Sequence, residues 1–243
     1  MIMPTNMMPA NDPMRSGSAP VAGTGGAVVL SLSETEALCT RAARGAGLDW
    51  GHAEEAGRAA AWLARQGVPA CAPMLRCLQM QPLQLPDPQP GRWAGRGRAV
   101  LCPLRSGAAL ADHALLPEGL RDAGLTLETV ALPVLLLPFI AQAALLRGTA
   151  IKVTAGDVAL LLGPDGAGGD AGAMGALAEH AAADVTLCAR TEKFAAGQPV
   201  PAHSLPATPL PVWQTLDALA LRATVPASKS SLAGAGGTGS DND

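Results

Sequence analysis

The chain has 243 residues, of which 49% are hydrophobic and 15% charged, and its formal net charge is −3. This length suits one folded domain with a substantial core, and because alanine supplies much of the hydrophobic fraction, we expect that core to be rich in leucine. Two Phe and no Tyr leave few stacking platforms for single-stranded nucleic acid, and the negative charge offers no basic footprint for phosphates. Composition therefore argues against a nucleic-acid partner.

Low-complexity composition marks both ends of the chain. Residues 1–27 are rich in Met, Pro, Gly, Ser and Asn and hold no apolar run, which predicts a disordered leader and not a signal peptide. Residues 227–243 are Gly-rich and are expected to form a flexible tail. Between them we predict a single α+β domain at 28–226, with an extended Pro-rich connector at 82–90.

Cysteine usage and one uncharged, largely apolar run bear on the cellular compartment. The five cysteines are scattered, form no C-x-x-C pair and have no histidine nearby at zinc-ligand spacing, which favours a reducing cytoplasm and gives no metal site at the cysteines. The uncharged run 129–146 is interrupted by Pro133, Pro138 and Gln142. A membrane span needs about 20 predominantly apolar residues, so we interpret this run as core and expect no membrane contact. No cofactor motif is recognised.

A helical hairpin is the first expected structure. Ser33 and Glu36 have the spacing of a capping box, which predicts that a helix begins there. That helix is expected to end at Gly45 or Gly47, either of which can adopt the left-handed conformation that stops a helix. Asp49 is the expected cap of a second helix, in which small residues would let another element approach closely.

The rest of the domain is expected to alternate strands and helices. A short helix is predicted at 73–80, before the connector. Apolar runs bounded by Gly, Pro or Asp then predict strands at 99–104, 125–137, 150–153, 158–162 and 185–189. Helices are expected at 106–115, 138–146, 174–182 and 212–221. The predicted fold class is α+β, in which the N-terminal hairpin precedes a mixed sheet covered by helices.

Charge gathers in the predicted hairpin of this charge-poor chain. Arg41, Arg44, Glu54 and Glu55 could meet across it. A carboxylate pair near guanidinium groups can act as acid and base, so Glu54 and Glu55 are the catalytic candidates, while the two arginines would hold an anionic group. The alternative is a lattice of surface salt bridges, each worth about 0–1 kcal/mol. His52 is a further candidate base, although a single histidine is more often a capping or surface residue.

Short segments near both ends of the chain share one further pattern. They are Leu32–Leu38, Arg41–Gly47, Trp50–Gly51, Ala53–Arg58, Trp62–Leu63, Val225–Ser228 and Asp241–Asp243. In these segments the chain resembles an uncharacterised bacterial family, domain of unknown function 3726. The resemblance brackets residues 30–243 and implies a single family domain without an established activity. The chain departs from the family's pattern at His52 and Lys229, where an aliphatic residue and an acid are expected, and this argues against His52 as a family-wide catalyst.

The resemblance also gives weight to the acidic end of the chain. It implies that Trp50, Ser228, Asp241 and Asp243 belong with the arginines in the ligand-binding set. The leading hypothesis is a cytoplasmic small-molecule-binding protein or enzyme of bacterial metabolism, with a polar pocket between the hairpin and the sheet that closes under the tail.

The alternative hypothesis is a non-catalytic interaction subunit. Such a protein would pack a stripe of small residues against another protein and insert its C-terminal tail into that partner. The stripe consists of Ala53, Ala56, Gly57 and Ala60.

Overall fold

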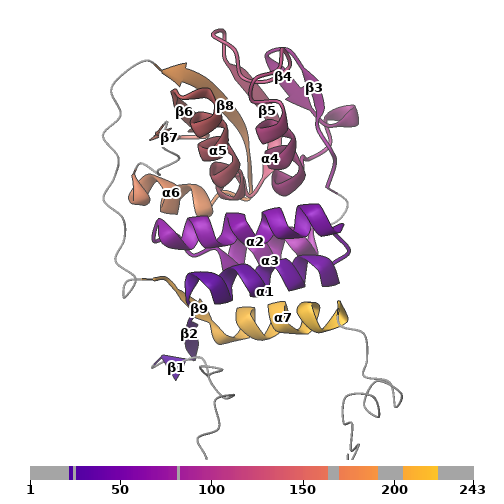
Figure 1. Cartoon of the computed structure of the whole chain (residues 1–243), viewed down its shortest axis with the longest axis vertical. Helices are drawn as coiled ribbons and strands as arrows, with labels where there is room; N and C mark the ends of the chain where they lie inside the picture. The colour runs from indigo at the N-terminus through magenta and orange to yellow at the C-terminus, as the bar shows by residue number, and fades with distance from the viewer. Residues whose placement is uncertain (1–21, 24–25, 81–82, 164–169, 191–204, 224–243) are drawn as a thin grey trace, which may run out of the picture.

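The computed structural model describes residues 22–23, 26–80, 83–163, 170–190 and 205–223. Figure 1 shows that these residues form a sheet at one end and a layer of helices at the other. The predicted α+β class is confirmed. Most of the predicted leader and tail lies outside the described residues, so their disorder stays a prediction.

The main sheet has six strands in the order β3-β4-β5-β8-β6-β7. Strands β4 and β5 pair in parallel and the other neighbours are antiparallel, so the sheet is mixed, as predicted. The strands are β3 (Asp87–Gln89), β4 (Arg92–Ala94), β5 (Leu125–Ala131), β6 (Ala150–Ala155), β7 (Val158–Leu162) and β8 (Ala182–Arg190). A second, three-stranded sheet joins β1 (Ala22–Gly23), β2 (Ala27–Val29) and β9 (Ala207–Pro209).

The helices form two groups (Figure 1). The layer away from the sheet contains α1 (Leu32–Gly45), α2 (Trp50–Arg65), α3 (Cys71–Gln79) and α7 (Leu210–Arg222). Helices α4 (Pro103–Asp112) and α5 (Leu137–Arg147) lie against the sheet, and α6 (Ala171–Ala178) lies near the helical layer. Two short 3₁₀ turns, η1 (Arg96–Arg98) and η2 (Pro133–Leu136), complete the described elements.

The hairpin begins two residues earlier than predicted. Ser31, and not Ser33, caps α1: its Oγ accepts the N–H of Glu34 at 3.2 Å, and Glu34 Oε2 accepts the N–H of Ser31 at 2.8 Å. Ser31 and Glu34 have the same capping-box spacing as the predicted pair, so the pattern alone did not separate them. The predicted cap at Asp49 is confirmed, because its Oδ1 accepts the N–H of His52 at 3.0 Å.

Small residues bring α1 and α2 into close contact. A Cβ atom on Gly57 would lie 2.0 Å from Thr40 Oγ1 and 2.7 Å from the carbonyl oxygen of Glu36. Ala53 and Ala60 on the same side of α2 are fully buried. The small-residue stripe is therefore filled by the chain's own first helix, which corrects the hypothesis that it packs against another protein.

Prolines shorten two of the predicted strands. Only Leu101 of the predicted strand 99–104 pairs with neighbours, through bridges to Gln84 and Val130, since Pro103 already begins α4. The predicted strand 125–137 ends at Ala131, because Leu132 is left-handed at φ 42° and Pro133 opens η2. A proline cannot donate to a strand ladder but is well placed in a first helical turn.

Short strands appear where the sequence predicted connection or disorder. The proline-rich connector contains β3, which forms an edge hairpin with β4 through the left-handed Gly91. Strands β1 and β2 include residues of the predicted leader, so ordered chain begins before residue 28. The strands of both hairpins are only two or three residues long. An alternating pattern of apolar and polar residues cannot identify strands as short as this.

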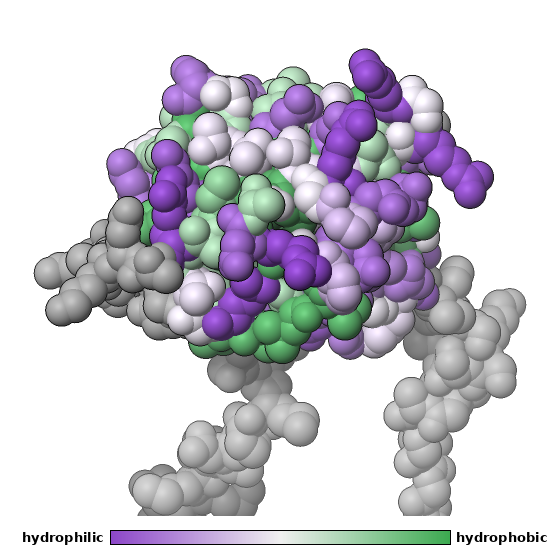
Figure 2. Space-filling model, turned by 90° about the horizontal axis from the view of Figure 1, so that it is seen from above, coloured by the Kyte–Doolittle hydropathy of each residue, from purple (hydrophilic) through white to green (hydrophobic). Residues whose placement is uncertain are grey.

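The core is rich in leucine, as predicted, and includes the two large aromatic side chains Trp93 and Phe139. Trp93 is fully buried and its Nε1–H donates to the carbonyl oxygen of Glu118 at 2.7 Å. Seen from the sheet end in Figure 2, the surface mixes hydrophilic and near-neutral side chains, with a hydrophobic strip along one edge. Within the described part of the chain, no helix has the length and apolar character that crossing a membrane requires.

Candidate functional site

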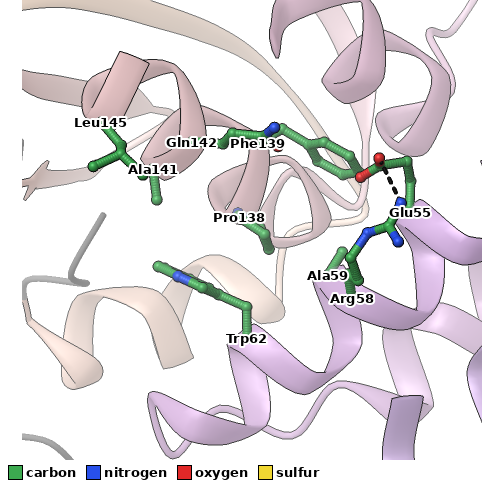
Figure 3. Close-up of a pocket in the computed structure, with 9 residues that line it drawn as sticks. All are labelled: Glu55, Arg58, Ala59, Trp62, Pro138, Phe139, Ala141, Gln142 and Leu145. Atoms are coloured by element: carbon green, nitrogen blue, oxygen red, sulfur yellow. Dashed lines mark hydrogen bonds and ion pairs between the residues drawn. The ribbon is translucent and has the colours of Figure 1, made fainter. Parts of the chain in front are cut away.

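A groove runs between α2 and the helix pair α4 and α5. It consists of two adjoining cavities of about 530 Å³ and about 270 Å³, and both are lined by Glu55, Arg58 and Gln142. We call these cavities together the α2 groove. Figure 3 shows the larger one, with Trp62 and the Glu55–Arg58 pair projecting from α2 and Pro138 and Leu145 from α5. The sequence placed a pocket between the hairpin and the sheet, whereas this groove lies between the hairpin and the helices that cover the sheet.

Helical spacing explains how α2 supplies one wall of the groove. His52, Glu55, Ala59 and Trp62 recur every three or four residues and therefore lie on one side of the helix. The opposite wall comes from α4 in the smaller cavity, through Asp112 and two alanines, and from α5 in the larger cavity.

An ion pair lies where the two cavities meet. Arg58 Nη2 is 2.8 Å from Glu55 Oε1, and Arg58 Nη1 is 3.8 Å from Glu54 Oε2. The hydrogen bond that Arg58 donates to Glu55 raises the pKa of Arg58, and the charges of Glu55 and Glu54 raise it further, against a smaller opposing effect of burial. Arg58 thus keeps its positive charge, and its side chain remains half exposed toward the groove.

The carboxylate of Asp49 and the imidazole of His52 line the smaller cavity. His52 Nδ1 is 2.6 Å from Asp49 Oδ2. Two hydrogen bonds hold the pKa of Asp49 below its ordinary value. The larger effect comes from the backbone N–H of His52 and the smaller from its side chain. When Nδ1 donates to the carboxylate, the other ring nitrogen, Nε2, carries the lone pair and can accept a proton. The pair therefore has the form of an oriented base beside Glu55.

The two ends of the groove differ in polarity. Asp49, Glu55 and Asp112 line the smaller cavity together with one guanidinium, that of Arg58. The far end of the larger cavity is lined by apolar side chains. These are Trp62, Pro138, Ala141 and Leu145. The groove thus suits a ligand with a polar head and an apolar body, and the carboxylates outnumber the guanidinium at the polar end.

The structure separates the two predicted catalytic carboxylates. Glu55 lines the α2 groove, whereas Glu54 lines a different cavity of about 580 Å³, which Arg41 and Thr40 of α1 share. Successive helical residues are about 100° apart around the axis, so adjacent glutamates face different sides of α2. The predicted pairing of both glutamates with both arginines is therefore replaced by pairing of both glutamates with Arg58.

The two predicted arginines also lie in different surroundings, because Arg41 lines the cavity of Glu54 and Arg44 does not. Arg44 Nη1 donates to the carbonyl oxygen of Leu48 at 2.6 Å, and its guanidinium carbon lies 5.5 Å from the centre of the Trp50 ring. Trp50 itself is 65% exposed. Arg44 and Trp50 thus form a cation–π contact beside the hairpin turn, and neither residue lines the cavities described above. The predicted ligand residues Ser228, Asp241 and Asp243 lie outside the described residues.

Sequence reasoning missed several residues of the groove, among them Arg58, Trp62, Gln142 and Asp112. Arg58 and Trp62 were visible as continuations of the polar side of α2 at helical spacing, and Gln142 as the one polar residue in the run 138–146. Asp112 carried no local signal, because only the packing of α4 against α2 brings it to the groove. Among the described residues, no three His, Cys, Asp or Glu side chains cluster as metal ligands would.

Comparison with known proteins gives a family for part of the chain. Residues 30–119 match the model of a family described as a protein of unknown function (DUF3726). Over these residues the chain is similar to that family, which confirms the predicted resemblance there. The matched segment holds α1 to α4, hence two of the three helices that line the α2 groove, while α5 lies beyond it. No curated protein and no solved structure matches the chain.

Proposed function

We propose that the protein is a cytoplasmic small-molecule-binding protein or enzyme of bacterial metabolism whose ligand occupies the α2 groove. The observation that carries the proposal is the Glu55–Arg58 pair, 2.8 Å apart, at the junction of the two cavities. A cavity of about 530 Å³ is in the ordinary range for small-molecule sites. Its mixture of apolar walls and a few convergent polar groups is also typical of such sites.

The charges of the groove favour an amine. Asp49, Glu55 and Asp112 supply three carboxylates at the polar end, whereas Arg58 supplies one permanent positive charge and already pairs with Glu55. An ammonium group would compensate the excess negative charge. The apolar body of the same ligand would cover Trp62 and Leu145 at the other end. We therefore propose a primary amine with an apolar body as the ligand class.

Two groups near the proposed head of the ligand can exchange protons. His52, oriented by Asp49, offers Nε2 as a base, and Glu55 offers a carboxylate held by Arg58. An enzyme using them would transfer a proton to or from the bound amine or a neighbouring carbon. Glu55 keeps the role that the sequence predicted for it, while Glu54 belongs to the other side of the helix.

The alternative of an interaction subunit has lost one of its two supports. Its small-residue stripe is buried against α1. Its tail, residues 227–243, lies outside the described residues, so insertion of that tail into a partner stays a prediction.

A thermal-shift panel tests the proposal with the full chain. The panel compares primary amines with apolar bodies against carboxylic acids and alcohols of the same carbon skeleton. A ligand at 100 times its Kd adds about 2.7 kcal/mol to the free energy of unfolding, which raises Tm visibly. We expect amines to raise Tm of the wild type and of Glu54→Gln, and to lose that effect in Glu55→Gln.

The two glutamates make a matched pair of variants, since each removes one charge from the same turn of α2 and both contact Arg58. Equal shifts in Glu55→Gln and the wild type would contradict the groove as the binding site. Shifts from acids but not from amines would contradict the proposed ligand class. The absence of any shift across the amines would count against the small-molecule function itself.

A further inference from the structure

The β6–β7 end of the main sheet has two different faces. From Ile151 onward, buried residues of β6 and β7 alternate with residues that are partly or fully exposed. The buried residues pack toward α5 and α6, so the residues between them lie on the opposite face of the sheet. These residues are Lys152, Thr154, Ala159 and Leu161. We call this the outer face of the sheet.

Strand pairing brings two basic side chains together on the outer face. In the antiparallel pair of β6 and β8, Lys152 lies opposite Cys188, and Ala150 lies opposite Arg190. Lys152 and Arg190 are therefore diagonal neighbours on one face, and such neighbours are about 7–8 Å apart. Both side chains are long enough to reach a single group bound between them.

A cavity of about 430 Å³ lies at this pair of basic residues. Lys152 and Arg190, both half-buried, supply its charged lining, and the neighbouring strand β7 supplies an apolar wall. That wall consists of Ala159, Leu160 and Leu161. Leu161 lies directly opposite Lys152 in the pairing of β6 with β7. Among the described residues, no acidic side chain lines this cavity.

The carboxylates of the neighbouring strands β5 and β8 are already engaged elsewhere. Glu128 of β5 accepts a hydrogen bond from Arg92 Nε at 2.6 Å, and Asp184 of β8 accepts the N–H of Thr129 at 2.7 Å. Asp184 is six residues from Arg190 along β8, which corresponds to about 20 Å of extended strand. In the part of the chain that the structure describes, neither Lys152 nor Arg190 forms an ion pair. Two positive charges thus face one cavity without compensation.

We propose that this cavity binds a soluble phosphate monoester. A phosphate monoester carries a charge of about −1.5 to −2 at pH 7, so it compensates both basic side chains, whereas a carboxylate compensates only one. The guanidinium of Arg190 can donate two parallel hydrogen bonds to phosphate oxygens, and the ammonium of Lys152 acts as a point charge beside them. The organic part of the ester would cover Ala159 and Leu161.

This site is separate from the α2 groove in place and in charge. Helix α5 lines the groove and also lies against the sheet, and the outer face is on the far side of that sheet (Figure 1). Carboxylates are in excess at the polar end of the groove, while the ionisable side chains that line the outer-face cavity are basic. The phosphate site therefore does not depend on the ligand proposed for the groove.

Isothermal titration calorimetry of the full chain tests the proposal with three probes: phenyl phosphate, inorganic phosphate and benzoate. We expect phenyl phosphate to bind most tightly, because it combines the dianion with an apolar ring. Benzoate has the same ring but a single charge, so it should bind about tenfold more weakly or worse. Co-sedimentation with vesicles of phosphatidic acid in phosphatidylcholine distinguishes a lipid phosphate from a soluble ester. We expect the protein to stay in the supernatant.

Substitutions on the same sheet locate the binding. Lys152→Gln and Arg190→Gln should each weaken phenyl phosphate binding about tenfold or more, since each removes a charged hydrogen-bond donor. Arg92→Gln is the matched control: it removes one positive charge from the sheet, but that charge already pairs with Glu128. This control should leave the affinity nearly unchanged. Glu55→Gln, which alters the α2 groove, should also leave it unchanged, so the two proposed sites succeed or fail separately.

Four results would overturn the proposal. They are the absence of binding by either phosphate, binding of benzoate as tight as that of phenyl phosphate, equal losses in Arg92→Gln and Arg190→Gln, and sedimentation with the phosphatidic acid vesicles. Circular dichroism verifies the fold of each variant, and Lys152→Met replaces Lys152→Gln where that variant is unfolded. The comparison of phenyl phosphate with benzoate uses the wild type alone and therefore decides the ligand class without any variant.

Discussion

The two sides of α2 differ in the size and the polarity of their side chains. The side toward α1 consists of Ala53, Ala56, Gly57 and Ala60, all buried. The side toward α4 and α5 carries His52, Glu55, Arg58 and Trp62 and lines the α2 groove. One helix thus forms a close backbone contact on one side and one wall of an open groove on the other.

The difference shows how side-chain size distributes space around a helix. Small residues let α1 approach until no room remains for even one methyl group at Gly57. Long side chains on the other side keep α5 at a distance and leave about 530 Å³ between them. On the side toward α1, close packing therefore limits which substitutions the fold tolerates. On the groove side, a substitution changes mainly the charge and the shape of the groove.

The largest expected effect comes from truncating a buried leucine of α2. Leu63 is fully buried, so Leu63→Ala should lower the free energy of unfolding by about 2–5 kcal/mol through lost transfer free energy and a remaining cavity. The same substitution at Leu145, which lines the groove and is 55% exposed, should cost less than about 1 kcal/mol. Urea unfolding of both variants measures the difference, and equal losses would contradict the contrast between packed core and open groove.

Adding one methyl group to α2 should lower stability on the packed side of the helix but not in its exposed first turn. In Gly57→Ala the new Cβ would collide with Thr40 Oγ1 and with the backbone oxygen of Glu36, which cannot rotate away. We expect a loss of about 1–3 kcal/mol, despite the higher helix propensity of alanine. Gly51→Ala is the control in the same helix, because its Cβ would meet only Asp49 Oδ1 at 3.7 Å. A Gly57→Ala variant as stable as Gly51→Ala would show that α1 and α2 can separate without cost.

Local signals predicted the elements whose ends are marked by residues of special geometry. Asp49 caps α2 as expected, and β7 has the predicted bounds, because each depends on residues within one turn or one strand. The cap of α1 was misplaced since two serines offered the same spacing, and choosing between them requires the packing of the whole helix. Strands β1 and β9 could not be predicted, because each is only two or three residues long and depends on a partner far away in sequence.

The candidate site was predicted in part for the same reason. Glu55 was identified because charge is rare in this chain, but neighbours in sequence were taken as neighbours in space. On a helix, Glu54 and Glu55 face different cavities, whereas Arg58, three residues further on, lies beside Glu55. Asp112 reaches the same groove only through the packing of α4 against α2, a long-range contact that no local pattern contains.

Removing a charge from the groove side should have a small effect on stability. The carboxylates of Glu54 and Glu55 both contact Arg58 at partly exposed positions. Glu55→Gln should therefore lower the free energy of unfolding by about 0–1 kcal/mol. Glu54→Gln should cost less, because its distance to Arg58 is 3.8 Å and not 2.8 Å. Added salt should reduce both losses by screening the charges. Urea unfolding at low and high salt provides the measurement. A loss in Glu55→Gln that exceeds about 2 kcal/mol would show that the pair is structural and weaken its assignment to ligand binding.

The smallest expected effect concerns the cap of α2, and it depends on pH. The N–H and side chain of His52 hold the pKa of Asp49 below its ordinary value, so the ionised carboxylate stabilises the folded state. This stabilisation is complete above the pKa of the unfolded chain, about 3.9, and disappears as the pH falls through the lower folded pKa. Asp49→Asn keeps a capping oxygen but cannot ionise, so its deficit relative to the wild type should be constant near neutral pH and shrink below about pH 4. Asp49→Ala, which loses the cap as well, should be less stable than Asp49→Asn at every pH. Urea unfolding at stepped pH measures these differences, and a deficit of Asp49→Asn that persists at the lowest pH would mean that the charge of Asp49 does not stabilise the helix.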